Sequence, residues 1–83
     1  MHASVMPLFT KHNYTAAEAQ GLVGREVRFA TGVRTGRGLP IKKGERGRVT
    51  GVLHQPDGEL VIVNVRNVGE VYVGNAGALE LAD

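Results

Sequence analysis

Turn-forming residues divide the chain after residue 24 into short apolar segments, and this spacing constrains the fold more than any other feature. "REVRFA" at 25–30 alternates in polarity, and "LVIVNVRN" at 60–67 is dense in β-branched side chains, so both are typical of strands. "QPDGE" at 55–59 combines a proline and a glycine, as tight turns do. Short strands at this spacing predict a small, mostly β domain: a five-stranded antiparallel barrel or sandwich.

The N-terminal part of the chain predicts an arm and one short helix. Residues 1–13 show no clear period, which is typical of an extended arm. Thr15 and Glu18 have the spacing of a capping box, and the alanines around them favour a helix over residues 15–22. We therefore expect an N-terminal arm at 1–13 and a single domain at 14–83, with the short helix leading into the sheet.

Between the strands, the sequence predicts one long loop and several tight connections. Residues 31–44 are rich in glycine and turn formers, so we expect a single loop there. In the strand that follows, simple alternation places Val49 and Leu53 on the inner face. A tight turn is expected at 68–70, then a strand at 71–74, one helical turn from Asn75 to Ala78, and a last strand that contains Leu79 and Leu81.

Charge is unevenly distributed along the chain, although the formal net charge is only +2. Residues 25–48 hold eight basic side chains against two acidic ones, a net of +6. Residues 49–83 hold one basic side chain against five acidic ones, a net of −4. This division predicts a basic face that meets an anionic partner, either nucleic acid or an acidic protein surface, or else two solvated halves of opposite sign.

The segment "GRGLPIKKGERGRVTG" at 36–51 contains much of this basic charge. It is not a nucleotide-binding loop of a known kind, because it lacks Gly-Lys-Ser/Thr and leads into a strand rather than a helix. Its cations can neutralise phosphates, and an exposed tyrosine can stack on a base. The predicted nucleic-acid site comprises Arg34, Arg37, Lys42, Lys43, Arg46, Arg48 and Tyr72.

The chain shows no pattern typical of an enzyme. Its three histidines, at positions 2, 12 and 54, are scattered, and no metal-ligand cluster or Ser/His/Asp pattern stands out. The absence of cysteine excludes a disulfide, a thiolate zinc site and a cysteine nucleophile. No signal peptide is evident, and the longest apolar run, 60–63, is too short to span a bilayer. We expect a cytoplasmic binding module without cofactor, metal or membrane contact.

The order of the expected elements resembles the SH3-like barrel over residues 24–82. In that fold the first loop is long and a short 3₁₀ turn precedes the last strand. Within this region, "KKGERGRVTGV" at 42–52 resembles a KOW-type segment, in which a Lys-Gly step leads into a strand. This resemblance implies a nucleic-acid, ribosomal or transcriptional partner. Glycines at this point are also required by many SH3-like barrels for steric reasons alone.

The end of the chain, "VYVGNAGALEL", resembles the end of the plasmid-borne type II dihydrofolate reductases, which act as homotetramers around a central pore. Val71 and the run Ala78-Leu79-Glu80 match that family. Tyr72 falls at the position of its ligand-binding glutamine, Val73 at that of its isoleucine, and Gly74 at that of its tyrosine. Two of the three pore residues are therefore lost, which argues against reductase activity and leaves a pore-type enzyme as a competing class.

A second competing class is an adaptor or homo-oligomer that uses the segment "ELVIVNVR" at 59–66. If its valines at 61, 63 and 65 face the core, Leu60 and Ile62 point to the opposite face, where exposed apolar side chains need a cover. The helix at 15–22 is the expected cover within one chain. A second copy of the chain is the alternative, and we expect self-association as well.

Overall fold

The computed structural model describes residues 13–83, so the expected arm lies outside the described residues except for Asn13. The described elements, in chain order, are α1 (Ala16–Leu22), β1 (Glu26–Phe29), β2 (Val33–Arg34), β3 (Pro40–Ile41), β4 (Arg46–Gln55), β5 (Gly58–Val65), β6 (Gly69–Val73), the 3₁₀ helix η2 (Ala76–Ala78) and β7 (Leu79–Leu81).

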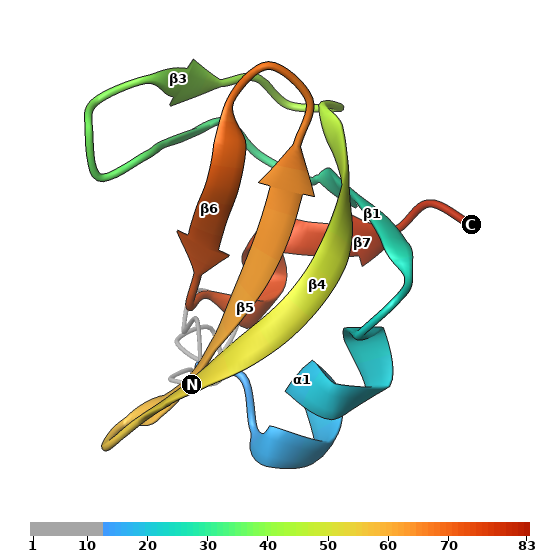
Figure 1. The fold of residues 1–83 in the computed structure, drawn as a ribbon, viewed down its shortest axis with the longest axis vertical. Coiled ribbons are helices and arrows are strands. Elements are labelled where there is room, and N and C mark those ends of the chain that lie inside the picture. The colour runs from blue at the N-terminus through green and yellow to red at the C-terminus, as the bar shows by residue number, and fades with distance from the viewer. Residues whose placement is uncertain (1–12) are drawn as a thin grey trace, which may run out of the picture.

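Five of these strands form one antiparallel sheet in the order β6-β5-β4-β1-β7, and β2 and β3 form a separate two-stranded ribbon (Figure 1). The prediction of a mostly β, five-stranded antiparallel fold with one short helix is therefore confirmed. The sheet is not closed into a barrel, because β6 and β7 are its two edges. After β6, η2 carries the chain across to β1, and β7 pairs there instead of with β6.

The inner face of the sheet holds the core. Alternate residues of the strands point inward, as the β-branched pattern predicted, and pack with little or no exposure to solvent. Ile41 from the ribbon and Ala78 from η2 complete the same cluster. The buried side chains of the sheet are Val27, Phe29, Val49, Val61, Val63, Val65, Val71 and Val73.

The helix α1 begins with the predicted capping box. The Thr15 hydroxyl accepts the Glu18 amide N–H, and the Glu18 carboxylate accepts the Thr15 amide N–H. Ala19 is fully buried and belongs to the core cluster, so α1 covers the inner face of the sheet. The expectation that this helix covers Leu60 and Ile62 is wrong, since those two side chains point to the other face.

A β-bulge in β4 corrects the predicted orientation of Leu53. Val49 lies opposite Val63, but the next paired residue, Gly51, lies opposite Ile62, so Thr50 is an extra residue. An extra residue reverses the alternation of all that follows. Consequently Val52, rather than Leu53, packs against the core, and Leu53 is 43% exposed on the outer face.

The region expected to be one long loop contains the β2–β3 ribbon. Val33 pairs with Ile41 and Arg34 with Pro40. Ile41 is buried and anchors the base of the ribbon in the core, while the tip, residues 35–39, stands out beside β6 (Figure 1). Gly38, at φ +84°, provides the left-handed backbone that the tip requires. Gly36 and Gly38 thus lie at the tip of a hairpin rather than in an unpaired loop.

The connections near the end of the chain follow the sequence closely. The turn of "QPDGE" joins β4 to β5, and η2 begins at its N-cap Asn75, both as predicted. The turn between β5 and β6 lies at residues 66–68, two residues before the expected position. Asn67, with φ +67°, and Gly69, with φ +100°, both have left-handed backbone, so the chain reverses between Arg66 and the first residue of β6.

Candidate nucleic-acid interface

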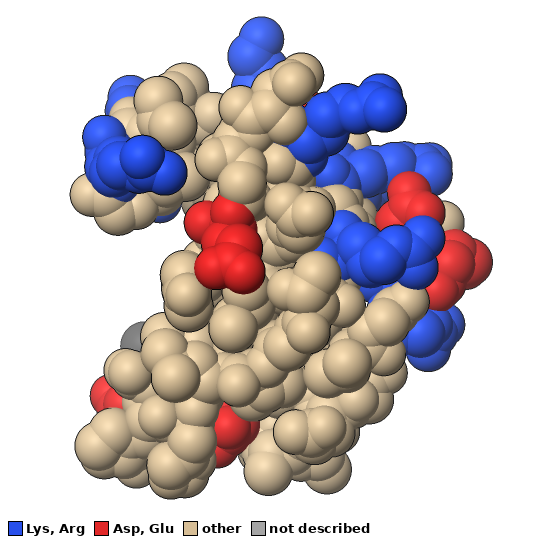
Figure 2. Space-filling model, in the orientation of Figure 1, with Lys and Arg blue, Asp and Glu red and all other residues tan. Residues whose placement is uncertain are grey.

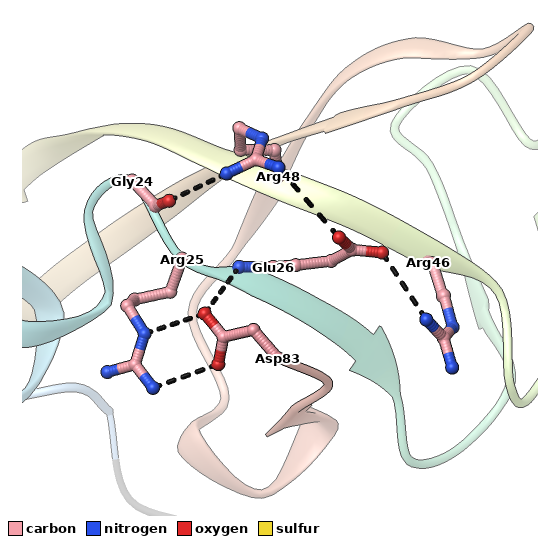
Figure 3. A network of polar contacts seen from close by, with 6 residues as sticks. All are labelled: Gly24, Arg25, Glu26, Arg46, Arg48 and Asp83. Carbon is pink, nitrogen blue, oxygen red and sulfur yellow. Dashed lines mark hydrogen bonds and ion pairs between the residues drawn. The ribbon is translucent and has the colours of Figure 1, made fainter.

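One group of basic residues, in β1 and directly before it, is neutralised by ion pairs. Arg25 makes a two-bond pair with Asp83, with Nε–Oδ2 at 2.8 Å and Nη2–Oδ1 at 2.9 Å (Figure 3). This pair holds the pKa of the Asp83 carboxyl at about 2 and raises the pKa of Arg25. Arg28 pairs with Glu80 at 2.8 Å on the neighbouring strand. These cations have carboxylate partners in the folded chain.

Arg46 and Arg48, two residues of the predicted site, share a single carboxylate. Glu26 lies 3.5 Å from Arg46 Nη1 and 3.8 Å from Arg48 Nη2, and Arg48 also donates to the Gly24 carbonyl at 2.8 Å (Figure 3). The pairing of β1 with β4 brings Glu26 directly opposite Arg48. Both arginines are exposed on β4, as predicted, but Glu26 partly offsets their charge.

A second group of cations has no carboxylate partner within residues 13–83. Arg34 donates only to the Gly38 carbonyl of its own hairpin, at 2.9 Å. Lys and Arg side chains gather around the end of the molecule where β4 begins and β5 ends (Figure 2). The members of this unpaired group are Arg34, Arg37, Lys42, Lys43 and Arg66.

Arg66 is the member of this group that sequence analysis missed. Arg66 belongs to residues 49–83, the acidic half of the chain, where it is the sole basic residue. Val65 pairs with Gly47, so the turn that begins at Arg66 lies at the same end of the sheet as the start of β4. The sequence does contain a signal for the position of Arg66. When the two strands that flank the predicted turn "QPDGE" are paired outward from that turn, residue 66 comes close to residue 46.

A groove runs between the ribbon tip and the free edge of β6. Its main cavity, of ≈ 630 Å³, is lined on one side by Arg34 and Arg37 and on the other by Glu70 and Tyr72. A second hollow of ≈ 350 Å³ shares Arg34, Val71 and Tyr72 with the first and continues along β6. Figure 2 shows the molecular surface hollowed between the ribbon and the body of the domain. The main cavity is therefore lined by three residues of the predicted site, Arg34, Arg37 and Tyr72.

The two lysines of the predicted site lie beside this groove rather than in its main cavity. Lys42 lines a shallower hollow of ≈ 380 Å³ together with Pro40 and Ile41 at the base of the ribbon. Lys43 lies in the turn closed by the bond from the Glu45 N–H to the Lys42 carbonyl, at 3.1 Å. Both side chains are exposed, so they extend the basic surface from the groove toward β4.

The outer face of the sheet carries an apolar patch beside this basic surface. Leu60 lies opposite Leu53, and Ile62 lies opposite Tyr72, so all four side chains share the face that points away from the core. Leu53 and Tyr72 are 43% and 51% exposed, and Leu60 and Ile62 are half-buried. The predicted interface residues Leu60 and Ile62 thus lie within a larger apolar patch.

The described residues hold few other candidate sites. Within residues 13–83, no three His, Asp or Glu side chains are grouped closely enough to hold a metal ion. In the same part of the chain, no helix has the length and apolar character needed to cross a membrane. Comparisons of the chain with models of protein families, with curated proteins and with solved structures find no match.

Proposed function

We propose that this protein is a non-enzymatic module that binds nucleic acid along its basic end and the groove beside β6. The observation that carries the proposal is the set of cations with no carboxylate partner within residues 13–83, two of which line a groove that holds an exposed tyrosine. These cations are Arg34, Arg37, Lys42, Lys43 and Arg66. Unpaired cations neutralise phosphates and release counterions, which provides affinity without sequence preference. Arg46 and Arg48 contribute less, because Glu26 already offsets their charge.

The proposal also takes the open sheet to be an SH3-like fold. The long excursion between β1 and β4 and the 3₁₀ helix before β7 are the two features of that fold which the chain has. Two of the three glycines in the KOW-like segment have a structural explanation: Gly44 has left-handed backbone at φ +92°, and a Cβ on Gly47 would lie 2.8 Å from the Asn64 carbonyl oxygen. The KOW resemblance therefore adds little support for nucleic-acid binding, and the proposal depends on the unpaired cations.

Binding of a fluorescently labelled oligonucleotide, followed by anisotropy at increasing salt, tests this function. We compare Lys42→Gln/Lys43→Gln with Arg25→Gln/Arg28→Gln, which removes the same charge from ion-paired positions. If both lysines contact phosphates, the first variant binds more weakly and its salt dependence falls, by about 0.7 per contact in the log–log slope for a single strand. Equal losses in the two variants, or affinity that does not change with salt, would contradict the proposal.

Self-association is the second candidate, and the outer apolar patch favours it. Leu53, Leu60, Ile62 and Tyr72 place exposed apolar surface on one sheet face, as an interface between two copies requires. A pore-type enzyme would also need an oligomer. Sedimentation velocity on the wild type tests the homo-oligomer and the pore-type enzyme: a monomer at all concentrations excludes both.

The anionic partner could instead be an acidic protein surface. That alternative predicts binding to acidic polypeptides and none to oligonucleotides.

A further inference from the structure

We infer that the groove beside β6 takes an unpaired base, whose ring stacks on Tyr72 and whose exocyclic amino group donates a hydrogen bond to Glu70. This inference rests on the proposed function and names the form of nucleic acid that the groove selects. It predicts a preference for single strands over duplexes, and for cytosine over thymine.

Tyr72 places an aromatic ring on β6, at a free edge of the sheet. Tyr72 and Glu70 are two residues apart on β6, so their side chains share one face. The Tyr72 hydroxyl donates to Glu70 Oε1 at 3.4 Å, and both residues line the main cavity. Tyr72 is 51% exposed, whereas Tyr14, the other tyrosine, is buried. An exposed ring of this kind is the surface on which single-strand binders stack bases.

The two walls of the groove carry charge of opposite sign. Arg34 and Arg37 make the ribbon wall cationic, and Glu70 places a carboxylate on the β6 wall. A carboxylate repels phosphate and accepts hydrogen bonds only, so the group that approaches it must be a donor on a base. Cytosine presents its N4 amino group as a donor, whereas thymine presents the O4 acceptor at the corresponding position. The backbone of the strand therefore follows the arginines, and the base edge faces Glu70.

The volume of the main cavity also fits a single base. The main cavity, of ≈ 630 Å³, lies within the range of about 300–1,000 Å³ typical of pockets for small ligands. A cavity of this size holds the base of an unpaired nucleotide. In a duplex the bases are stacked and their Watson–Crick edges are occupied, so Tyr72 and Glu70 have nothing to contact unless a base leaves the helix.

The experiment measures dissociation constants for oligo(dC), oligo(dT) and a dC·dG duplex, each about 10 nucleotides long, at one salt concentration. Wild type is expected to bind oligo(dC) about 2- to 12-fold more tightly than oligo(dT), the value of one hydrogen bond. Tyr72→Ala should weaken binding of both single strands at least about 5-fold, whereas Tyr72→Phe, which keeps the ring, should not. Binding of the duplex should be weaker than that of oligo(dC) and insensitive to Tyr72→Ala.

Glu70→Ala and the matched control Glu45→Ala separate base recognition from charge. Each variant removes one carboxylate near the basic surface, but Glu45 lies outside the main cavity. Glu45→Ala should bind both single strands somewhat more tightly and keep the ratio between oligo(dC) and oligo(dT). Glu70→Ala should abolish this ratio, because oligo(dC) loses its hydrogen bond whereas oligo(dT) gains from the removed negative charge. Equal affinity of wild type for the two single strands, or a ratio that Glu70→Ala leaves intact, overturns the inference alone. A complete lack of binding overturns the proposed function with it.

Discussion

Replacing Gly47 by alanine is a direct test of how β4 packs against β5. Gly47 lies in β4, between Val27 of β1 and Val65 of β5. A Cβ at this position would lie 2.6 Å from Val63 Cγ1, 2.8 Å from the Asn64 carbonyl oxygen and 3.2 Å from Val65 Cγ2. The side chains could rotate away, but the carbonyl belongs to the paired strand and cannot move without shifting the ladder.

The expected cost follows from these contacts. Overpacking a well-packed site costs about 1–3 kcal/mol, and we expect Gly47→Ala in the upper part of this range because a backbone atom blocks the new methyl group. For a domain of this size, 1 kcal/mol lowers the melting temperature by about 4–8 °C. Gly47→Ala should therefore lower it by roughly 8–24 °C.

Thermal unfolding followed by far-UV circular dichroism measures this effect, with Gly21→Ala as the control. Gly21 lies in α1 with nothing within 4 Å of an added Cβ, so the same methyl group meets no obstacle there. Alanine is also the better helix former by about 1 kcal/mol, so this control should be stabilised. A Gly47→Ala variant that melts at the wild-type temperature would show that β5 yields easily and that the reasoning is wrong.

Three further predictions concern local interactions. The Tyr14 hydroxyl is buried without a hydrogen-bond partner among residues 13–83, and burial together with the charge of Glu18 raises its pKa to about 12. The folded chain therefore holds this proton more tightly than the unfolded chain, so stability should fall by roughly 2–3 kcal/mol as the pH rises from about 10 to 12. In urea titrations across this range, Tyr14→Phe should remove that loss, and an unchanged profile would refute the assignment. Thr15→Ala should lower the free energy of unfolding by about 1 kcal/mol through loss of the helix cap, measured in the same titrations at neutral pH. The ion pair of Arg25 with Asp83 lowers the pKa of Asp83 to about 2, so its contribution is present above the ordinary aspartate pKa. That contribution should disappear as the pH falls toward 2, and Asp83→Asn should show a smaller acid loss than wild type.

Local patterns were sufficient for most features that neighbouring residues determine, although the turn at 66–68 was expected two residues later. The capping box of Thr15 and Glu18, the turn at 55–59 and the helical turn after Asn75 involve residues a few positions apart, and all three were predicted from the sequence. The inward valines of β5 also followed from alternation, because no bulge interrupts that strand.

The other features that sequence analysis missed depend on pairing between distant residues. The extra residue Thr50 becomes visible only when β4 is aligned with β5. The ribbon within residues 31–44 depends on Ile41 reaching the core, and the open sheet depends on β7 joining β1. At the candidate site, the pairing of β1 with β4 brings Glu26 to Arg46 and Arg48, which reduces their expected role.

The anchoring of the ribbon by Ile41 makes its tip a natural position for redesign. Ile41 and Val33 tie the base to the core, whereas residues 36–39 of the tip are exposed. Insertions at exposed hairpin tips are tolerated because each doubling of loop length adds only about 0.6 kcal/mol of closure entropy. A library of tip sequences could therefore change one wall of the groove while β6 and the core stay as they are, so that one scaffold could present many binding surfaces.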